Sequence, residues 1–153
     1  MTELKEGDKA PAFKAKDQDG NIVSLADFKG KNLVLYFYPQ DDTPTCTKEA
    51  CNYRDSYQSL VSKGLAVVGV SFDTEKSHKK FIKKYELPFP LISDPDKKII
   101  GDYGVWGEKM LFGRNYMGTL RTTFLIDKKG VVTHIIRKVD SGNASQQVLD
   151  LLK

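Results

Sequence analysis

The sequence predicts an α/β fold in which helices cover both faces of a mixed central β-sheet, with a β-hairpin near the N-terminus. Continuous apolar runs at residues 33–38 and 65–72 are typical of strands that are buried on both faces. Segments with helical spacing of apolar residues follow these runs, and such alternation implies parallel strands joined by right-handed crossovers. Two late strands around a tight turn imply an antiparallel addition to the same sheet.

The N-terminal hairpin is predicted from its turn. Residues 12–16 and 22–25 flank the segment Asp-Gln-Asp-Gly-Asn, and these residue types favour a tight connection between two short strands. The Asp-x-Asp-Gly pattern also opens calcium-binding loops, but the later ligands and the closing glutamate of such a loop are absent here. We therefore expect a structural turn at this position.

The middle of the chain alternates between strands and helices. Pro39 ends the first buried strand, and apolar residues then recur at helical spacing from about residue 45 to residue 63. Gly64 provides the C-terminal stop of this helix. After the second buried strand, a lysine-rich helix is expected at 76–85, with Phe81, Ile82 and Tyr85 facing inward.

The last third of the chain completes the sheet and its cover. We expect a short strand at 91–92 and a short helix at 96–103. Two strands, at 122–127 and 131–137, are joined by a Lys-Lys-Gly turn, and a closing helix follows at 144–152. The glycine-rich stretch 104–118 is either the entrance to a site or a packed surface loop. This order of elements is that of a thioredoxin-like three-layer fold. At this length we expect residues 1–153 to form one domain.

Composition narrows the possible functions. With 40% hydrophobic and 29% charged residues, the chain resembles ordinary globular proteins. No apolar run approaches the ~20 residues of a membrane helix, so no membrane association is expected. Residues 1–9 lack the apolar segment of a secretory signal, and we expect a cytoplasmic protein. The net charge of +4 comes from lysines scattered beside acidic residues, whereas a nucleic-acid site would cluster them.

The two cysteines of the chain lie close together, at Cys46 and Cys51. In a protein without a secretory signal, such a pair indicates redox chemistry or metal binding rather than a structural disulfide. Cys46 falls in the first turn of the expected helix, where free N–H groups and the positive end of the helix dipole stabilise a thiolate. Periodicity alone favours a second interpretation, a small buried core residue aligned with Ala50, Tyr53 and Tyr57.

The neighbours of Cys46 favour the reactive interpretation. Hydroxyl groups surround the sulfur in sequence, and two prolines stiffen the loop that precedes the helix; these residues are Thr43, Thr45, Thr47, Pro39 and Pro44.

An intact helix keeps the two thiols apart. Residues five positions apart lie roughly 140° apart around a helix axis and about 7.5 Å apart along it. A disulfide needs Cα atoms within about 7 Å and converging Cβ vectors. Cys46 and Cys51 therefore either never pair, Cys51 being an inert core thiol, or pair only when the first turns of the helix unwind.

Two other uses of Cys46 receive less support. A structural zinc site normally shows two tight ligand pairs, and the two histidines, His78 and His134, lie far from the cysteines in sequence, on a charged helix and on a strand. A cysteine hydrolase would need a histidine beside Cys46. The sequence leaves His134 open for that role, although an exposed strand position is the simpler interpretation.

Arg121 is the arginine most suited to the site. It precedes the strand at 122–127, and in a thioredoxin-like sheet this end of the strand can lie beside the start of the Cys46 helix. A fixed guanidinium there would stabilise a thiolate and an oxyanion leaving group. The alternative is a surface ion pair. Glu49, one turn from Cys46, is either a proton-relay group or an ordinary partner of the helix dipole.

The residues around Cys46 resemble those of peroxiredoxins. The pattern Pro39-x-x-x-Thr43-x-x-Cys46 matches the peroxidatic signature of that family at every fixed position. The run 36–51 is closer still to the bacterioferritin comigratory, or Q-type, branch. Thr45 departs from it, since relatives commonly carry glycine there. Further matches extend over nearly the whole chain, at Ser93-Asp-Pro-Asp96, Tyr103-Gly-Val-Trp-Gly-Glu108 and Arg121-Thr-Thr-Phe-Leu-Ile-Asp127.

The resemblance implies a thiol peroxidase acting on hydrogen peroxide and organic hydroperoxides. Cys46 would be the peroxidatic thiolate, Thr43 would orient the peroxide, Arg121 would stabilise the departing oxygen, and Pro39 would shield the sulfur from water. Cys51 would then attack the Cys46 sulfenic acid to form an intramolecular disulfide, which thioredoxin would reduce. No metal or organic cofactor is implied. Because both thiols lie in one chain, a dimer is not required, and we expect a monomer.

Two competing functions share the same thiols. A redox sensor or interaction domain would use them without turnover. A thiol–disulfide oxidoreductase is disfavoured, because the chain has no Cys-x-x-Cys motif.

Overall fold

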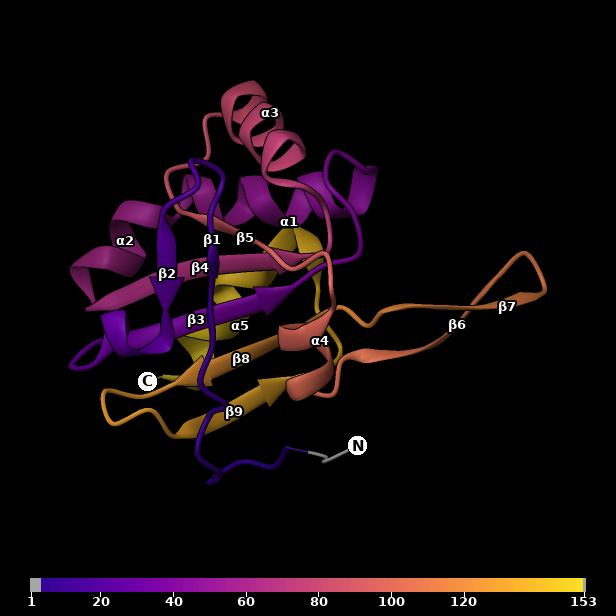
Figure 1. Ribbon diagram of the computed structural model, residues 1–153. Coiled ribbons are helices and arrows are strands. Elements are labelled where there is room, and N and C mark those ends of the chain that lie inside the picture. Colours follow the sequence, from indigo (N-terminus) through magenta and orange to yellow (C-terminus); the bar gives the residue numbers. More distant parts are fainter. Residues whose placement is uncertain (1–3, 153) are drawn as a thin grey trace.

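The computed structural model describes residues 4–152 and contains a five-stranded sheet at its centre (Figure 1). The first three residues of the N-terminal segment considered above lie outside this range. The strand order is β5-β4-β3-β8-β9, with bounds β3 (Asn32–Phe37), β4 (Leu65–Ser71), β5 (Leu91–Ser93), β8 (Thr122–Ile126) and β9 (Val132–Ile136).

The pairing of the strands is mixed, as expected. β3 runs parallel to β4, and β4 runs parallel to β5, so helices connect them. β8 is antiparallel to both β3 and β9, which completes the predicted antiparallel addition. The thioredoxin-like fold class predicted from the element order is therefore confirmed.

Alternate side chains of β3 fill two separate cores. Leu33, Leu35 and Phe37 belong to one buried cluster, and Val34 and Tyr36 belong to the other. The first face is covered by the N-terminal hairpin, a short 3-10 helix and one α-helix, namely β1 (Lys14–Lys16), β2 (Ile22–Ser24), Leu25–Phe28 and α4 (Lys98–Asp102). The second face is covered by α1 (Pro44–Asp55), α2 (Tyr57–Ser62), α3 (Glu75–Tyr85) and α5 (Ala144–Leu151).

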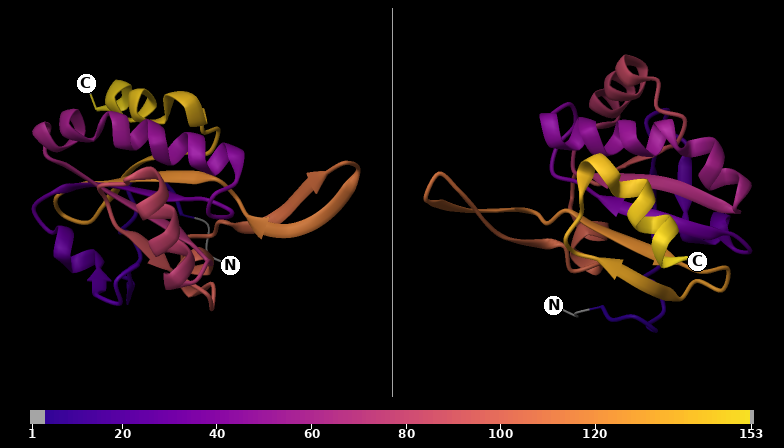
Figure 2. Two further views of the ribbon diagram at one scale, coloured as in Figure 1. Left: turned by 90° about the horizontal axis from the view of Figure 1, so that it is seen from above. Right: turned by 180° about the vertical axis from the view of Figure 1, so that it is seen from behind.

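Helices α1 and α5 lie side by side on the second face, whereas α3 lies against the edge strand β5 (Figure 2). Among the described helices, none combines the length and apolar character that crossing a bilayer requires.

The expected helix from residue 45 to residue 63 is interrupted. α1 ends at Asp55, and Ser56 separates it from α2. The Ser56 hydroxyl accepts a hydrogen bond from Ser145 of α5 at 2.9 Å. The apolar spacing continues through this position, so helical periodicity alone does not reveal the break.

The glycine-rich stretch is neither a plain loop nor packed on the surface. It forms an antiparallel hairpin, β6 (Trp106–Leu111) and β7 (Arg114–Thr119), which projects from the body of the protein (Figure 1). Near its tip Phe112 is 94% exposed. The two strands went unpredicted because their glycines and charges disrupt the apolar alternation by which strands are recognised.

Candidate active site

Cys46 lies in the first turn of α1, after the loop that follows the central strand β3. Thr43 occupies the N-cap position in an extended conformation, and Pro44 opens the helix. Cys46 follows in the first turn with its side chain against the sheet, and the residue is only 2% exposed. Cys46 therefore satisfies both predictions: it lies in the first turn of a helix, and it is also a buried residue on the apolar face of α1.

The structure brings Arg121 to the sulfur. Arg121 precedes β8, which pairs with β3, so its side chain arrives beside the start of α1. Nη2 donates to Cys46 Sγ at 3.1 Å, and Nη1 donates to Glu49 Oε1 at 2.7 Å. Burial lowers the pKa of Arg121, but the adjacent Cys46 and Glu49 outweigh that effect and hold the pKa above its ordinary value. One guanidinium therefore serves two potential anions, the Cys46 sulfur and the Glu49 carboxylate.

Glu49 is the unusual member of this group. Its residue is fully buried, and Oε2 has no hydrogen-bond partner among the described residues. Burial raises the pKa of Glu49 to about 7, against the opposing effect of Arg121. The carboxyl group is thus near its midpoint at neutral pH, where it can hold or release a proton next to the sulfur.

Glu49→Gln should remove part of the pH dependence of stability. A folded-state pKa that lies above the unfolded value means that the folded protein binds the extra proton, so stability is fully present at low pH and is lost as pH rises toward about 7. We expect the urea midpoint of the unmodified protein to fall more between pH 5 and pH 8 than that of Glu49→Gln. Equal falls would show that ionisation of Glu49 costs the fold nothing.

The two remaining residues of the predicted signature lie in the loop before α1. The Thr43 hydroxyl donates to the carbonyl of Gln40 at 3.0 Å rather than to the sulfur. Pro39 lies two residues after the end of β3 and is half-buried. Their assigned roles stay predictions, although both residues lie on the segment that leads from β3 to Cys46.

Cys51 lies on the same uninterrupted helix as Cys46, and both thiols are free. Cys51 is half-buried, and burial raises the pKa of its thiol, partly offset by Arg54. Arg54 itself pairs with Asp55 and donates to the carbonyl of Tyr85 at 2.8 Å. The folded helix therefore holds the two sulfurs in the separated arrangement that its geometry demands.

One cation near the site went unpredicted. Lys109, on β6, extends along the hairpin and donates to the carbonyl of Thr119 at 3.1 Å. Burial and the positive charge of Arg121 lower the pKa of Lys109, whereas Cys46 opposes that shift. No local sequence signal marks this lysine, since only the folding of the hairpin places its charge near Arg121.

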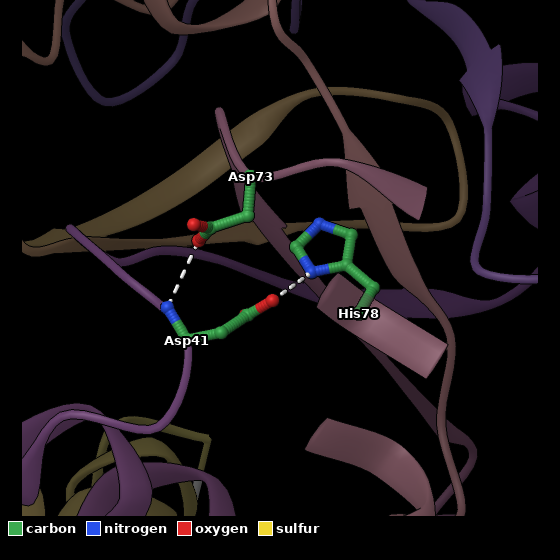
Figure 3. Close-up of side chains that lie close together, drawn as sticks. All are labelled: Asp41, Asp73 and His78. Carbon is green, nitrogen blue, oxygen red and sulfur yellow. Dashed lines mark hydrogen bonds and ion pairs between the residues drawn. The ribbon is translucent and has the colours of Figure 1, made fainter. Parts of the chain in front are cut away.

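The positions of the two histidines bear on the hydrolase and metal-site alternatives. His134 lies on the edge strand β9, where its Nδ1 contacts Thr133 at 3.1 Å, and within residues 4–152 no hydrogen bond joins it to Cys46. The described residues therefore give the Cys–His hydrolase alternative no support. His78 lies on the charged helix α3, as expected; the structure adds that it is fully buried and lies beside Asp41 and Asp73 (Figure 3).

The chain is similar to known peroxiredoxins over nearly its whole length. The AhpC/TSA family profile matches residues 6–135. The chain is 45% identical over 147 residues to peroxiredoxin Bcp of Bacillus subtilis (96% of this chain, 94% of the relative). It is 42% identical over 153 residues to peroxiredoxin Bcp of Escherichia coli (100% and 98%). Among solved structures, the bacterioferritin comigratory protein of Xanthomonas campestris, studied for its alkyl peroxide reduction activity, is 34% identical with a TM-score of 0.85 (92% and 89%).

Proposed function

Because the chain belongs to the AhpC/TSA family and, within it, to the Bcp peroxiredoxins, which are thiol peroxidases, we propose that Cys46 is its peroxidatic residue and Cys51 its resolving residue. The contact between Arg121 and Cys46 Sγ carries this proposal. A half-buried guanidinium that contacts a sulfur in the first turn of a helix stabilises the thiolate, which is the reactive form of cysteine.

The first step is attack of the Cys46 thiolate on one peroxide oxygen. An S–O bond forms as the O–O bond breaks, so that sulfur is oxidised to sulfenic acid and the peroxide is reduced. The departing oxygen leaves with negative charge and takes a proton to become water or an alcohol. Arg121 lies where it can stabilise that charge, and Glu49, with its pKa of about 7, is suited to supply the proton.

The second step joins the two cysteines. Cys51 attacks the sulfenic sulfur, the S–OH bond breaks, and the hydroxide leaves as water with the proton of the Cys51 thiol. Since both residues lie on α1, its first turns must unwind before the sulfurs can meet. A dithiol reductant then returns both thiols, and thioredoxin is the reductant that the family resemblance suggests.

The substrates we propose are hydrogen peroxide and organic hydroperoxides. The alkyl peroxide reduction studied in the Xanthomonas relative supports the organic class. Because resolution needs only one chain, we propose that the single domain acts as a monomer.

Mass spectrometry of the intact protein after one equivalent of hydrogen peroxide tests the two-cysteine cycle. We expect the unmodified chain to lose two hydrogens and remain monomeric, because the disulfide forms within it. Cys51→Ser should instead gain one oxygen, stall after that turnover, and gain a second oxygen with excess peroxide.

Two results would contradict the cycle. Sustained thioredoxin-supported turnover by Cys51→Ser would remove Cys51 from the resolving role. Failure of thioredoxin, its reductase and NADPH to sustain peroxide removal by the unmodified protein would favour a sensor that uses the same thiols without turnover.

A further inference from the structure

A buried polar cluster ties the loop that carries the peroxidatic signature to helix α3. Asp41 lies between Pro39 and Thr43 in that loop, and its side chain is 4% exposed. Its Oδ2 lies 2.7 Å from His78 Nδ1, on the first turns of α3, where the ring is fully buried (Figure 3). The backbone N–H of Asp41 donates to Asp73 Oδ2 at 2.9 Å. Asp41 is thus held by its side chain, through His78, and by its backbone, through Asp73.

Every polar atom of the Asp41 and His78 side chains has a hydrogen-bond partner. His78 Nε2 lies 3.0 Å from the carbonyl oxygen of Ile92, which can only accept, so Nε2 carries a hydrogen. Tyr38 and Ser77 donate hydroxyl hydrogens to the two oxygens of Asp41, at 2.6 and 2.7 Å. The 2.7 Å contact of His78 Nδ1 with Asp41 Oδ2 completes this network, so the buried pair is fully hydrogen-bonded.

The same atoms are close enough to consider a metal ion. The ligand atoms of Asp41, Asp73 and His78 lie within 4.8 Å of one another. However, both oxygens of the Asp41 carboxylate and both ring nitrogens of His78 already have hydrogen-bond partners. A cation would have to displace these partners, so the hydrogen-bonded pair accounts for the arrangement better.

The part of α1 that must unwind for the disulfide is also held at its C-terminal end, by hydrogen bonds of Asn52. Asn52 Oδ1 accepts from the backbone N–H and the hydroxyl of Ser145, each at 2.8 Å, and its amide donates to the carbonyl of Gly142 at 2.9 Å. The segment that must unwind for the disulfide therefore lies between two anchors, Asp41 before it and Asn52 after it.

We propose that Asp41 and His78 are positioning residues of the peroxidase: their buried hydrogen-bonded pair is a clamp that fastens the loop before α1 to α3, so that Thr43 and Cys46 return to the same place each time α1 refolds. The proposal rests on the peroxidase cycle proposed above. Small displacements of reacting groups are costly, since a misplacement of about 1 Å can lower a rate by about a hundredfold. Loosening the clamp should therefore favour the open helix over the closed, peroxide-reactive one.

This predicts opposite effects on the two steps of the cycle. In Asp41→Ala we expect the rate constant for peroxide reduction to fall about tenfold, because fewer molecules hold the closed site. Over-oxidation of Cys46 should also fall, because an easily opened α1 lets Cys51 reach the sulfenic acid sooner. Stopped-flow kinetics and the sulfinate yield per turnover measure the two effects.

Matched variants separate positioning from stability. Asp42→Asn alters the next residue, an exposed carboxylate bonded to Lys84 and Tyr85 at the other end of α3. Asparagine also tolerates the φ of 57° at this position, so the variant should stay within about twofold of the unmodified protein. Asp41→Asn and His78→Gln keep much of the side-chain shape and should shift both readouts in the Asp41→Ala direction, by about threefold. These variants provide the test if Asp41→Ala does not fold.

The clamp is overturned if the Asp41 and His78 variants match Asp42→Asn in both readouts. It is equally overturned if peroxide reduction falls only in proportion to the unfolded fraction seen by near-UV circular dichroism, with no decrease in sulfinate. An unmodified protein that does not reduce peroxide would instead refute the proposed function itself, so the two failures are distinguishable.

Discussion

Replacing Cys46 by serine is expected to lower the rate of peroxide reduction by at least about a thousandfold, to the level of buffer. A serine hydroxyl stays protonated beside Arg121 and cannot accept an oxygen atom from a peroxide. The substitution is nearly isosteric, so the packing of the residue against Ala50 and Tyr53 should persist. The loss should therefore reflect chemistry rather than unfolding.

The measurement is the initial rate of hydrogen peroxide loss with fully reduced protein at micromolar concentration. Cys51→Ser serves as the matched control, because it also removes one thiol from α1 but should retain the first turnover. Retained turnover in Cys46→Ser would mean that another group carries the reaction, and the mechanism would have to be abandoned.

Arg121→Ala should produce the second largest effect, a decrease of about a hundredfold to a thousandfold in the rate constant for peroxide reduction. The variant removes the donor at 3.1 Å from Cys46 Sγ, whose charge we propose stabilises the leaving oxygen in the first step. It also strips Glu49 of its partner, so this buried carboxyl group should take up a proton, which limits the loss of stability.

Arg121→Lys is the informative control. Lysine retains the charge but not the planar fork that reaches Cys46 and Glu49 together, so we expect it to recover only part of the rate. Stopped-flow kinetics at fixed pH, with urea unfolding to verify folding, measures both variants. A rate constant for Arg121→Ala within about threefold of the unmodified protein would show that the guanidinium has a structural role alone.

Local patterns predicted the framework of the sheet well. The two apolar runs became β3 and β4, the Lys-Lys-Gly turn joined β8 to β9, and Gly64 ended the helical segment with a φ of 78°. Strand burial, helical spacing and turn chemistry depend on residues close together in the chain, so they can be predicted from the sequence. The errors fell at Ser56, where the apolar spacing continues through the break, and in the 106–119 hairpin, where glycine-rich pairing decides the conformation.

The sequence by itself determined the relation between Cys46 and Cys51, because five residues on one helix fix their separation whatever surrounds them. Only the tertiary structure decided their environment. Arg121 reaches Cys46 across 75 residues, and Asp41 meets His78 across 37. Such contacts form when sheet pairing and helix packing bring distant side chains together. The sequence near one partner gives no information about the other. The contact of Arg121 with the sulfur, the burial of Glu49 and the hydrogen bonds that hold Asp41 are therefore properties of the folded protein.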